Sequence, residues 1–288
     1  MEQAKITPEE LRQLQLIDLE MVAEVDRICR KNGIEYSLDA GSLLGAIREK
    51  GIIPWDDDCD LVFARAEYEK FFEACKKDLD TTRFFLQDYR TDDGYRWRYA
   101  KLRRNGTEFI RPNQEHMHYN KGCFIDIFVA DNVPDNKIQM YLDHAFWFCT
   151  RKILYSEAGK VSAGNAFLRG WYRLLSRIPE KRVFAIQNKV ISHNNRKHTK
   201  KMIYNGYPMP RDTKYGFPSR FLENYIDVNF EGLKLRAMKD YDEYLQMAYG
   251  DYMTPPPIDQ RGFATTFSKL TLIPVTHEEI LKRYAKAD

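Results

Sequence analysis

Residues 41–61 read GSLLGAIREKGIIPWDDDCDL, and four aspartates, at positions 56, 57, 58 and 60, crowd the end of this stretch. Neighbouring carboxylates repel one another, so the cluster needs either solvent on a loop or a divalent cation, which takes oxygen ligands. Alternate residues of a β-strand point to the same face, so a strand here would present Asp58 and Asp60 side by side. The stretch therefore predicts a cation site where a loop enters a strand.

A glycine and a serine stand at the start of the short apolar helix that residues 42–49 predict. Between a strand and a helix, Gly41 and Ser42 would offer backbone N–H groups to a phosphate. The serine hydroxyl would lie beside them, and the glycine would permit close approach. The alternative is that Ser42 is an ordinary helix N-cap.

A third carboxylate stands within a second apolar strand. In GCFIDIFVAD, residues 122–131, Asp126 lies between two isoleucines, where a charge is costly unless it is paired or bound to a metal. If this strand neighbours the first, Asp58, Asp60 and Asp126 form a three-carboxylate site that suits Mg²⁺, or Mn²⁺ in its place, together with substrate phosphates. Such metals stabilise the attacking and leaving oxygens of a phosphoryl transfer.

The remaining patterns predict an α+β chain with a mixed β-sheet. Thr7, Pro8 and Glu10 form a capping box at the start of a helix with one apolar face, and Gly33 ends that helix. Periodicity gives the other elements. Strands are expected at 34–38, 59–65, 94–104 and 122–131, helices at 42–49, 68–79, 137–200 and 240–250, and a long loop at 202–222.

Composition bounds the class of protein. The first residues, MEQAKITPEELRQ, lack the apolar core of a signal peptide, and no run approaches the roughly 18 apolar residues of a membrane-spanning helix. The five cysteines include no CxxC pair, which argues against a disulfide framework or a zinc site. We therefore expect a reduced, cytoplasmic protein.

The net charge of +3 conceals a strong asymmetry. Residues 146–201 hold 13 Lys and Arg against two acidic residues, a formal charge of +11, which leaves −8 for the rest of the chain. Aromatic residues are interleaved with these cations. The segment predicts either a solvated helical face or a patch that lies peripherally on the inner face of an anionic membrane. Nucleic-acid binding is a further alternative, but we expect no nucleic acid as a partner.

The ordered set of strand, Gly-Ser, helix, DxD strand and later strand with a central Asp is typical of the polymerase-β-like nucleotidyltransferase fold. The longer stretch GIEYSLDAGSLLGAIREKGIIPWDDDCDL, residues 33–61, resembles the LicD family of phosphorylcholine transferases, which is also similar to fukutin and fukutin-related protein. The resemblance extends through YAKLRRNGT and GCFIDIF and resumes in FEGLKLRAMKDYDEYLQMAYGDYMTPP. It is faintest from about 137 to 215. Ser42 stands where the family often has Thr, and Cys59 where it usually has an aliphatic residue.

This resemblance implies a single domain over residues 1–288, with a core of about 7–135 and 216–288 and a helical basic segment of about 137–201. It also implies a phosphotransferase. CDP-choline would donate phosphocholine to a sugar hydroxyl of a cell-surface glycan, of the teichoic acid or lipopolysaccharide type, and CMP would leave. In such families the glycan acceptor is often linked to a lipid carrier.

Roles for single residues follow from the resemblance as well. Asp58 and Asp60 would hold Mg²⁺ with Asp126 as the third carboxylate, and Asp126 would also orient or deprotonate the attacking hydroxyl. The substrate-binding positions that the motif implies are Gly41, Ser42, Arg48, Trp55, Asp57 and Lys101. Arg48 and Lys101 would contact phosphates, since phosphoryl transfer depends on positioning and charge stabilisation. The alternative for both is a solvated surface charge.

Choline is a quaternary ammonium group, which aromatic cages bind. Trp55, Tyr95 and Trp97 are the candidates for such a cage, against the alternative that they pack in the core. Of Asp56 and Asp57, one would orient a ligand and the other would cap the turn.

Other functions fit parts of the pattern. On the same fold the chain would transfer a nucleotidyl group, or a polyol phosphate from CDP-ribitol or CDP-glycerol. A catalytically silent protein that binds lipid surfaces is the alternative from a different class. The intact carboxylate set argues against that alternative, because a like-charge cluster without a ligand only destabilises a fold.

Overall fold

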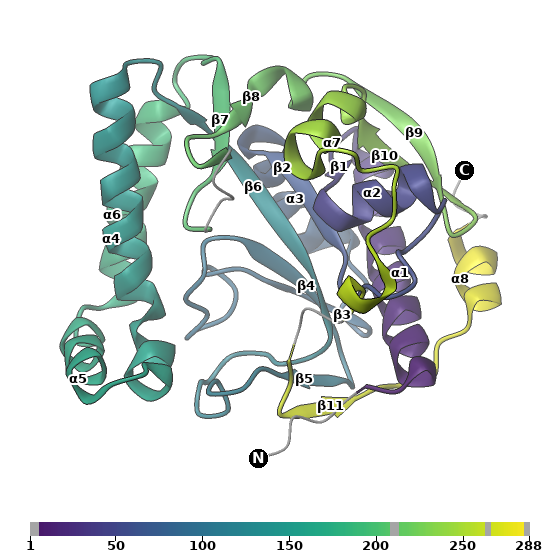
Figure 1. The fold of residues 1–288 in the computed structure, drawn as a ribbon, viewed down its shortest axis with the longest axis horizontal. Helices are drawn as coiled ribbons and strands as arrows, with labels where there is room; N and C mark the ends of the chain where they lie inside the picture. The colour runs from purple at the N-terminus through teal and green to yellow at the C-terminus, as the bar shows by residue number, and fades with distance from the viewer. Residues whose placement is uncertain (1–5, 208–212, 263–265, 285–288) are drawn as a thin grey trace.

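The computed structural model describes residues 6–207, 213–262 and 266–284. It has the mixed α+β architecture that the sequence predicts (Figure 1). The helices are α1 (Pro8–Asn32), α2 (Ala40–Arg48), α3 (Arg65–Asp78), α4 (Lys137–Ser162), α5 (Ala166–Leu175), α6 (Glu180–Asn194), α7 (Tyr241–Tyr249) and α8 (His277–Tyr284), with 3-10 turns η2 (Ser219–Leu222) and η3 (Ile258–Gln260). The strands are β1 (Ser37–Leu38), β2 (Asp60–Ala64), β3 (Phe84–Gln87), β4 (Ala100–Arg104), β5 (Glu108–Ile110), β6 (Phe124–Val133), β7 (Lys201–Tyr204), β8 (Phe217–Pro218), β9 (Tyr225–Phe230), β10 (Leu233–Met238) and β11 (Lys269–Thr271).

Strand β6 organises the main sheet, whose strand order is β1-β2-β6-β4-β3. Along one edge β6 pairs in parallel with β2. Along the other edge it pairs antiparallel first with β4 and then with β7, which pairs in turn with β8. One strand therefore runs from the predicted carboxylate site at its start to the helical segment at its end.

Helix α1 is buried over most of its length. The Thr7 hydroxyl accepts from the Glu10 N–H and the Glu10 carboxylate accepts from the Thr7 N–H, so the predicted capping box is confirmed. Gly33 ends the helix at φ +62°, a left-handed conformation that glycine adopts readily. The expected apolar face is confirmed, because Leu14, Ile17, Met21, Val25 and Ile28 are all buried. Burial extends beyond this face to Gln15 and Asp18, since α3 and α8 also flank α1.

Two expected strands are shorter in the structure. Within residues 34–38 only β1 pairs, and within residues 94–104 pairing begins at Ala100. The Tyr95 hydroxyl donates to the Tyr99 carbonyl at 2.9 Å, so the chain folds back there before it enters β4. The alternating aromatic residues of this stretch therefore surround a small cavity instead of covering one face of a strand.

The expected loop at 202–222 contains ordered pairing. Strands β7 and β8 extend the sheet from β6, and residues 208–212 of this loop lie outside the described residues. The β9–β10 hairpin was not predicted either, although Gly232 marks its turn with φ +84°. Strands β7 and β8, of four and two residues, are too short to establish a period in the sequence.

Helices α4, α5 and α6 form a column beside the sheet, and Figure 1 shows this column apart from α1 and α3. They fall within the predicted helical segment at 137–200, which breaks after Ser162 and after Leu175. The column has a small apolar cluster of its own, Leu154, Val183 and Phe184. Within the described ranges, no helix is both long and apolar enough to cross a membrane.

A buried ion pair fixes the far end of β6. The Arg65 guanidinium donates to both carboxylate oxygens of Asp131 at 2.8 Å. Amide groups of Asn195 and Asn205 donate to the same carboxylate at 2.7 and 3.1 Å. Burial alone would raise the pKa of Asp131, but Arg65 and Asn195 hold it below its usual value. The pair joins α3, β6, the end of α6 and the turn after β7.

We predict that Asp131→Ala lowers the free energy of unfolding by about 3–5 kcal/mol, because it leaves the Arg65 guanidinium buried without its partner. The measurement is urea denaturation at pH 7. Glu73→Gln is the matched control, since it breaks an exposed ion pair to Lys76 and should cost less than about 1 kcal/mol. Equal losses in the two variants would contradict the prediction.

Candidate functional site

Two carboxylates face each other across the β2–β6 pair. In the parallel register Asp60 is the partner of Asp126. Two hydrogen bonds hold the entry to β2: the Asp126 N–H donates to the Cys59 carbonyl at 3.0 Å, and the Asp60 N–H donates to the Ser42 hydroxyl at 2.8 Å. The predicted adjacency of the two aspartate-bearing strands is therefore present.

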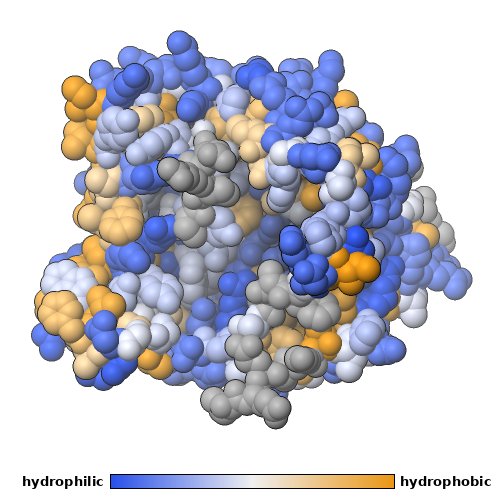
Figure 2. Space-filling model, in the orientation of Figure 1, coloured by the Kyte–Doolittle hydropathy of each residue, from blue (hydrophilic) through white to orange (hydrophobic). Residues whose placement is uncertain are grey.

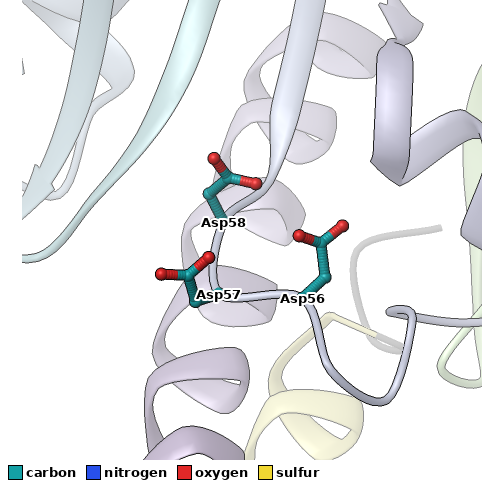
Figure 3. Close-up of side chains that lie close together, drawn as sticks. All are labelled: Asp56, Asp57 and Asp58. Carbon is teal, nitrogen blue, oxygen red and sulfur yellow. The ribbon is translucent and has the colours of Figure 1, made fainter. Parts of the chain in front are cut away.

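Three further carboxylates lie on the turn that leads into β2 (Figure 3). Oxygens of Asp56, Asp57 and Asp58 all lie within 4.8 Å of one another, which makes this turn a possible metal-binding group. The side-chain amide of Gln15 donates to the Asp56 carbonyl at 2.9 Å and so fixes the turn against α1. The preassembled group thus differs from the expected set of Asp58, Asp60 and Asp126, and Asp58 is common to both.

Burial and mutual repulsion raise the pKa of three of these carboxylates, Asp56, Asp58 and Asp60. Burial raises the pKa of Asp58 to about 7, and the charges of Asp56 and Asp126 add to the effect. Burial and Asp57 raise the pKa of Asp56 to about 6. The pKa of Asp60 rises well above its usual range through burial and the charges of Asp58 and Asp126. Asp56, Asp58 and Asp60 therefore repel one another, and a bound cation would favour their ionised forms.

Lys101 provides the nearest positive charge. Its ammonium forms an ion pair with the Asp126 carboxylate and lies 3.4 Å from the centre of the Phe124 ring. Burial lowers the pKa of Lys101 to about 7, although Asp126 opposes this shift. Only 4% of Lys101 is exposed, so the alternative of a solvated surface charge is wrong for this residue.

Arg48 is engaged away from the turn. Its guanidinium pairs with Glu49 at 2.7 Å and donates to the Tyr252 carbonyl at 2.9 Å. Its side chain is only 7% exposed, so it is not a freely solvated charge either. The same guanidinium lies 6.0 Å from the Trp55 ring, whose centre is also 4.6 Å from the guanidinium carbon of Arg261. The contacts shown for Arg48 are thus structural.

The expected choline cage is not assembled. Trp55 packs against the main core beside two arginines, whereas Tyr95 and Trp97 pack with Tyr119 at ring distances of 5.3–6.1 Å. The small cavity that Tyr95 and Trp97 line is not lined by Trp55. That cavity is also lined by Lys101 and two arginines, whose positive charges disfavour a quaternary ammonium group.

The Gly41–Ser42 pair lies inside α2, which begins at Ala40, so Ser42 is not the N-cap. Its hydroxyl positions Asp60 instead. A Cβ on Gly41 would lie 2.7 Å from a carboxylate oxygen of Asp56, so a larger residue here would displace the Asp56 side chain from its present position. Asp39 is the N-cap residue, and its carboxylate accepts from the Tyr204 and Tyr244 hydroxyls at 2.8 and 2.5 Å.

Sequence reasoning missed two charged residues at the site. Asp18 of α1 is buried, and burial together with the charges of Asp58, Asp57 and Asp56 raises its pKa well above the usual range. Arg111 lines the small cavity with Lys101; burial would lower its pKa, but Tyr99 and nearby aspartates raise it. A charged residue inside an apolar helical pattern was the available signal for Asp18. Arg111 follows β5 in a loop, where no pattern marks it.

We predict that Asp58→Asn stabilises the metal-free protein at pH 8. Because the pKa of Asp58 is raised in the folded state, folding binds a proton between pH 4 and about 7, and stability falls as pH rises through that range. Thermal denaturation in EDTA should show the variant several degrees above the parent at pH 8 and near it at pH 4. Asp93→Asn, on an exposed side chain, is the control. A difference between variant and parent that does not change with pH would sink this prediction.

Comparison with known proteins bears on the same stretch. Residues 33–155 match the LicD/FKTN/FKRP nucleotidyltransferase domain family. The chain is 26% identical over 267 residues to the lipopolysaccharide cholinephosphotransferase LicD of Haemophilus influenzae, a match that covers 86% of this chain and 92% of that protein. An uncharacterised protein of Rickettsia prowazekii is 43% identical over 77 residues, 20% of this chain and 29% of the relative. The acidic turn, β2 and Asp126 all fall inside the matched region, so the candidate site lies in the part of the chain that is similar to the LicD/FKTN/FKRP family.

Proposed function

We propose that this chain is a LicD-type phosphotransferase with a polymerase-β-like nucleotidyltransferase fold. It transfers phosphocholine from CDP-choline to a sugar hydroxyl of a lipopolysaccharide or teichoic acid, and CMP leaves. The observation that carries the proposal is the position of the carboxylates: Asp58 precedes β2, and Asp60 and Asp126 are register partners on adjacent strands. The similarity to a cholinephosphotransferase over most of the chain supports the choice of reaction.

A divalent cation suits these residues. The donors are carboxylate oxygens alone, which favours Mg²⁺, with Mn²⁺ as a substitute, over zinc or copper. The oxygens of the acidic turn already lie within 4.8 Å of one another, and their raised pKa values reflect a charge that the protein leaves partly uncompensated. We infer that Asp58 is the central ligand, with Asp60 and Asp126 or the neighbouring Asp56 and Asp57 completing the set. When bound, the cation would neutralise the phosphates of the donor.

The chain's own residues would then divide the reaction between them. The acceptor hydroxyl oxygen forms a bond to the phosphorus that carries choline, and the bond from that phosphorus to the oxygen of CMP breaks. The hydroxyl proton passes to the Asp126 carboxylate, which acts as the base. Lys101, in contact with Asp126, holds this carboxylate in place and offers positive charge to the phosphates.

The start of α2 is the proposed phosphate-binding element. Backbone N–H groups at Gly41 and Ser42 lie in the first turn of this helix, where the helix dipole favours anions. Ser42 also connects this turn to β2 through the Asp60 N–H. Arg48 and Trp55 would support the substrate site indirectly, without touching the phosphates. Their contacts are with Glu49, Tyr252 and Arg261.

We predict that CDP-choline with Mg²⁺ raises the melting temperature of the parent protein. Donor at about 100 times its dissociation constant should add roughly 2.7 kcal/mol of stability. Asp58→Ala should abolish this shift. Asp126→Ala should slow phosphocholine transfer by about 10²–10⁴-fold, the usual contribution of a general base, and should reduce the shift less than Asp58→Ala does, because Asp58 is the central ligand. Thermal-shift assays and a CMP-release assay measure the two effects.

The controls distinguish the alternatives on the same fold. Asp93→Asn should leave both the thermal shift and the transfer rate unchanged. If CDP-ribitol or CDP-glycerol raises the melting temperature and CDP-choline does not, the transferred group is a polyol phosphate and not phosphocholine. If only CTP or ATP raises it, the reaction is nucleotidyl transfer. No Mg²⁺-dependent shift with any of these donors would refute the proposed reaction.

A further inference from the structure

Two adjoining cavities separate the sheet from helix α4. One, of about 310 Å³, lies between the end of β6, β7 and α4; the other, of about 380 Å³, lies between residues 96–99 and α4. Arg151, Gly206 and Tyr207 line both cavities. We call the two together the α4 groove. In Figure 2 the surface is hollowed between the helical column and the rest of the molecule. The combined space is of the size that binds small ligands.

The α4 groove begins next to the carboxylate site. The Tyr207 ring lies 4.7 Å from the ring of Phe128, which stands two residues after Asp126 on β6 and so on the same face of the strand. The Tyr99 ring lies 5.7 Å from Tyr207 and 5.2 Å from the Lys101 ammonium. One layer of aromatic rings therefore joins the groove to the ion pair of Lys101 and Asp126.

The groove is strongly basic. Its cationic lining residues are Arg96, Arg98, Arg151, Lys152 and Lys214. Asp143 is the one carboxylate among the described lining residues, and it accepts from the side-chain amide of Asn194. The Arg96 guanidinium is engaged with the Leu154 carbonyl and with Glu180.

Arg151 differs from Arg96 in lacking such partners. It lies where the two cavities meet, and within the described residues its guanidinium makes neither a hydrogen bond nor an ion pair. Partial burial lowers its pKa. Its nearest aromatic contact is the Phe148 ring at 5.9 Å. A partly desolvated guanidinium with free donors is a binding group for phosphate or carboxylate.

We propose that the α4 groove binds the acceptor glycan and that Arg151 selects acceptors that carry a phosphate group near the reacting hydroxyl. Aromatic rings of Trp97, Tyr99 and Tyr207 provide the apolar surfaces on which sugar rings pack, and the cations supply the charge. The identification of the ligand as the acceptor rests on the proposed phosphotransferase function. Binding of a sugar phosphate to the groove does not.

The test uses Arg151→Gln with Arg196→Gln as matched control, since Arg196 is an exposed arginine of the same basic segment that lines neither cavity. Glucose 6-phosphate, glucuronate and glucose are titrated into each protein by calorimetry. We expect the parent and the control to bind glucose 6-phosphate, and Arg151→Gln to weaken it roughly tenfold or more. Glucuronate binding as tight as glucose 6-phosphate would overturn the preference for phosphate, and equal binding by all three proteins would overturn the role of Arg151.

Kinetics then separate this inference from the proposed function. With a phosphorylated oligosaccharide acceptor, Arg151→Gln should raise KM for the acceptor and leave the thermal shift by CDP-choline unchanged. If the parent binds glucose 6-phosphate through Arg151 but shows no transfer with CDP-choline, the proposed reaction fails and the groove as an anion site stands. An unchanged acceptor KM in Arg151→Gln would overturn the acceptor assignment.

A second, independent feature is the outer face of α5. Tyr172 packs inward, with its ring 5.7 Å from Tyr155 and against Gly159, where a Cβ would clash with the ring. Phe167, Trp171 and Leu174 follow the i, i+4, i+7 spacing of a different helix face and are 82%, 51% and 53% exposed. In Figure 2 apolar residues gather along the edge formed by the helical column. The helix therefore has one face packed against α4 through the half-buried Tyr172 and a second apolar face uncovered.

Charge decides which partner fits this face. Arg173 and Arg177 are exposed beside the apolar face, and the segment from 146 to 201 has a formal charge of +11. Two copies of this face would bring those like charges together, which disfavours a homodimer. An anionic lipid surface accepts both the aromatic side chains and the arginines. We propose that α5 docks the protein on anionic membranes, with Phe167, Trp171 and Leu174 entering the interface.

Vesicle co-sedimentation tests the second proposal. The parent should bind phosphatidylcholine vesicles that contain one quarter phosphatidylglycerol, and bind phosphatidylcholine alone at least tenfold more weakly. The triple variant Phe167→Ser, Trp171→Ser, Leu174→Ser should lose binding. Ile258→Ser, at an 80% exposed apolar residue outside the column, should not. Retained vesicle binding by the triple variant would overturn the proposal, as would a parent dimer in light scattering that the triple variant abolishes.

Discussion

Repulsion among carboxylates is the constraint on which the rest of this structure depends. The parallel pairing of β2 with β6 puts Asp60 opposite Asp126, and the turn before β2 adds three more aspartates within 4.8 Å of one another. Alone, such a cluster would open the fold. Ser42 therefore fixes the start of β2, Gln15 fixes the turn, and Lys101 neutralises Asp126 from the neighbouring strand β4. Elements far apart in the sequence thus hold these charges together at a cost in stability. We infer that the cluster is retained because it binds a ligand.

The two aspartates of β6 differ in the number of partners that hold them. The Asp131 carboxylate accepts hydrogen bonds from both arms of an arginine and from two side-chain amides. Its pKa therefore lies below the usual value despite burial. Asp126 has Lys101 alone among side-chain partners in the described residues. A lysine ammonium is a compact charge that moves more readily than a bidentate arginine fork. Asp126 can therefore exchange its partner during a reaction, whereas Asp131 keeps the strand in place.

Features of the fold that depend on a few neighbouring residues could be predicted from the sequence. The capping box at Thr7, the stop at Gly33 and the alternation that places Asp58, Asp60 and Asp126 near adjacent strands all act over a few residues. Contacts between side chains on different elements could not be predicted from the sequence. Nothing near Trp55 shows that Arg48 and Arg261 lie over its ring, and nothing near Tyr207 shows that it packs on Phe128. The serine expected to cap α2 instead holds β2, because the backbone N–H that it satisfies lies 18 residues away.

The helical column carries two surfaces that the sheet does not have: the lining of the α4 groove and the exposed apolar face of α5. Helix α4 lines the basic groove with Arg151 on one side, and at its end it supports α5 through Gly159 and Tyr172. The groove opens next to Asp126, while the exposed face of α5 points away from the α4 surface that anchors it. Under the two proposals, α5 holds the protein on the bilayer while the α4 groove binds the glycan. A glycan whose lipid anchor stays in that bilayer would then reach Asp126 without leaving the membrane.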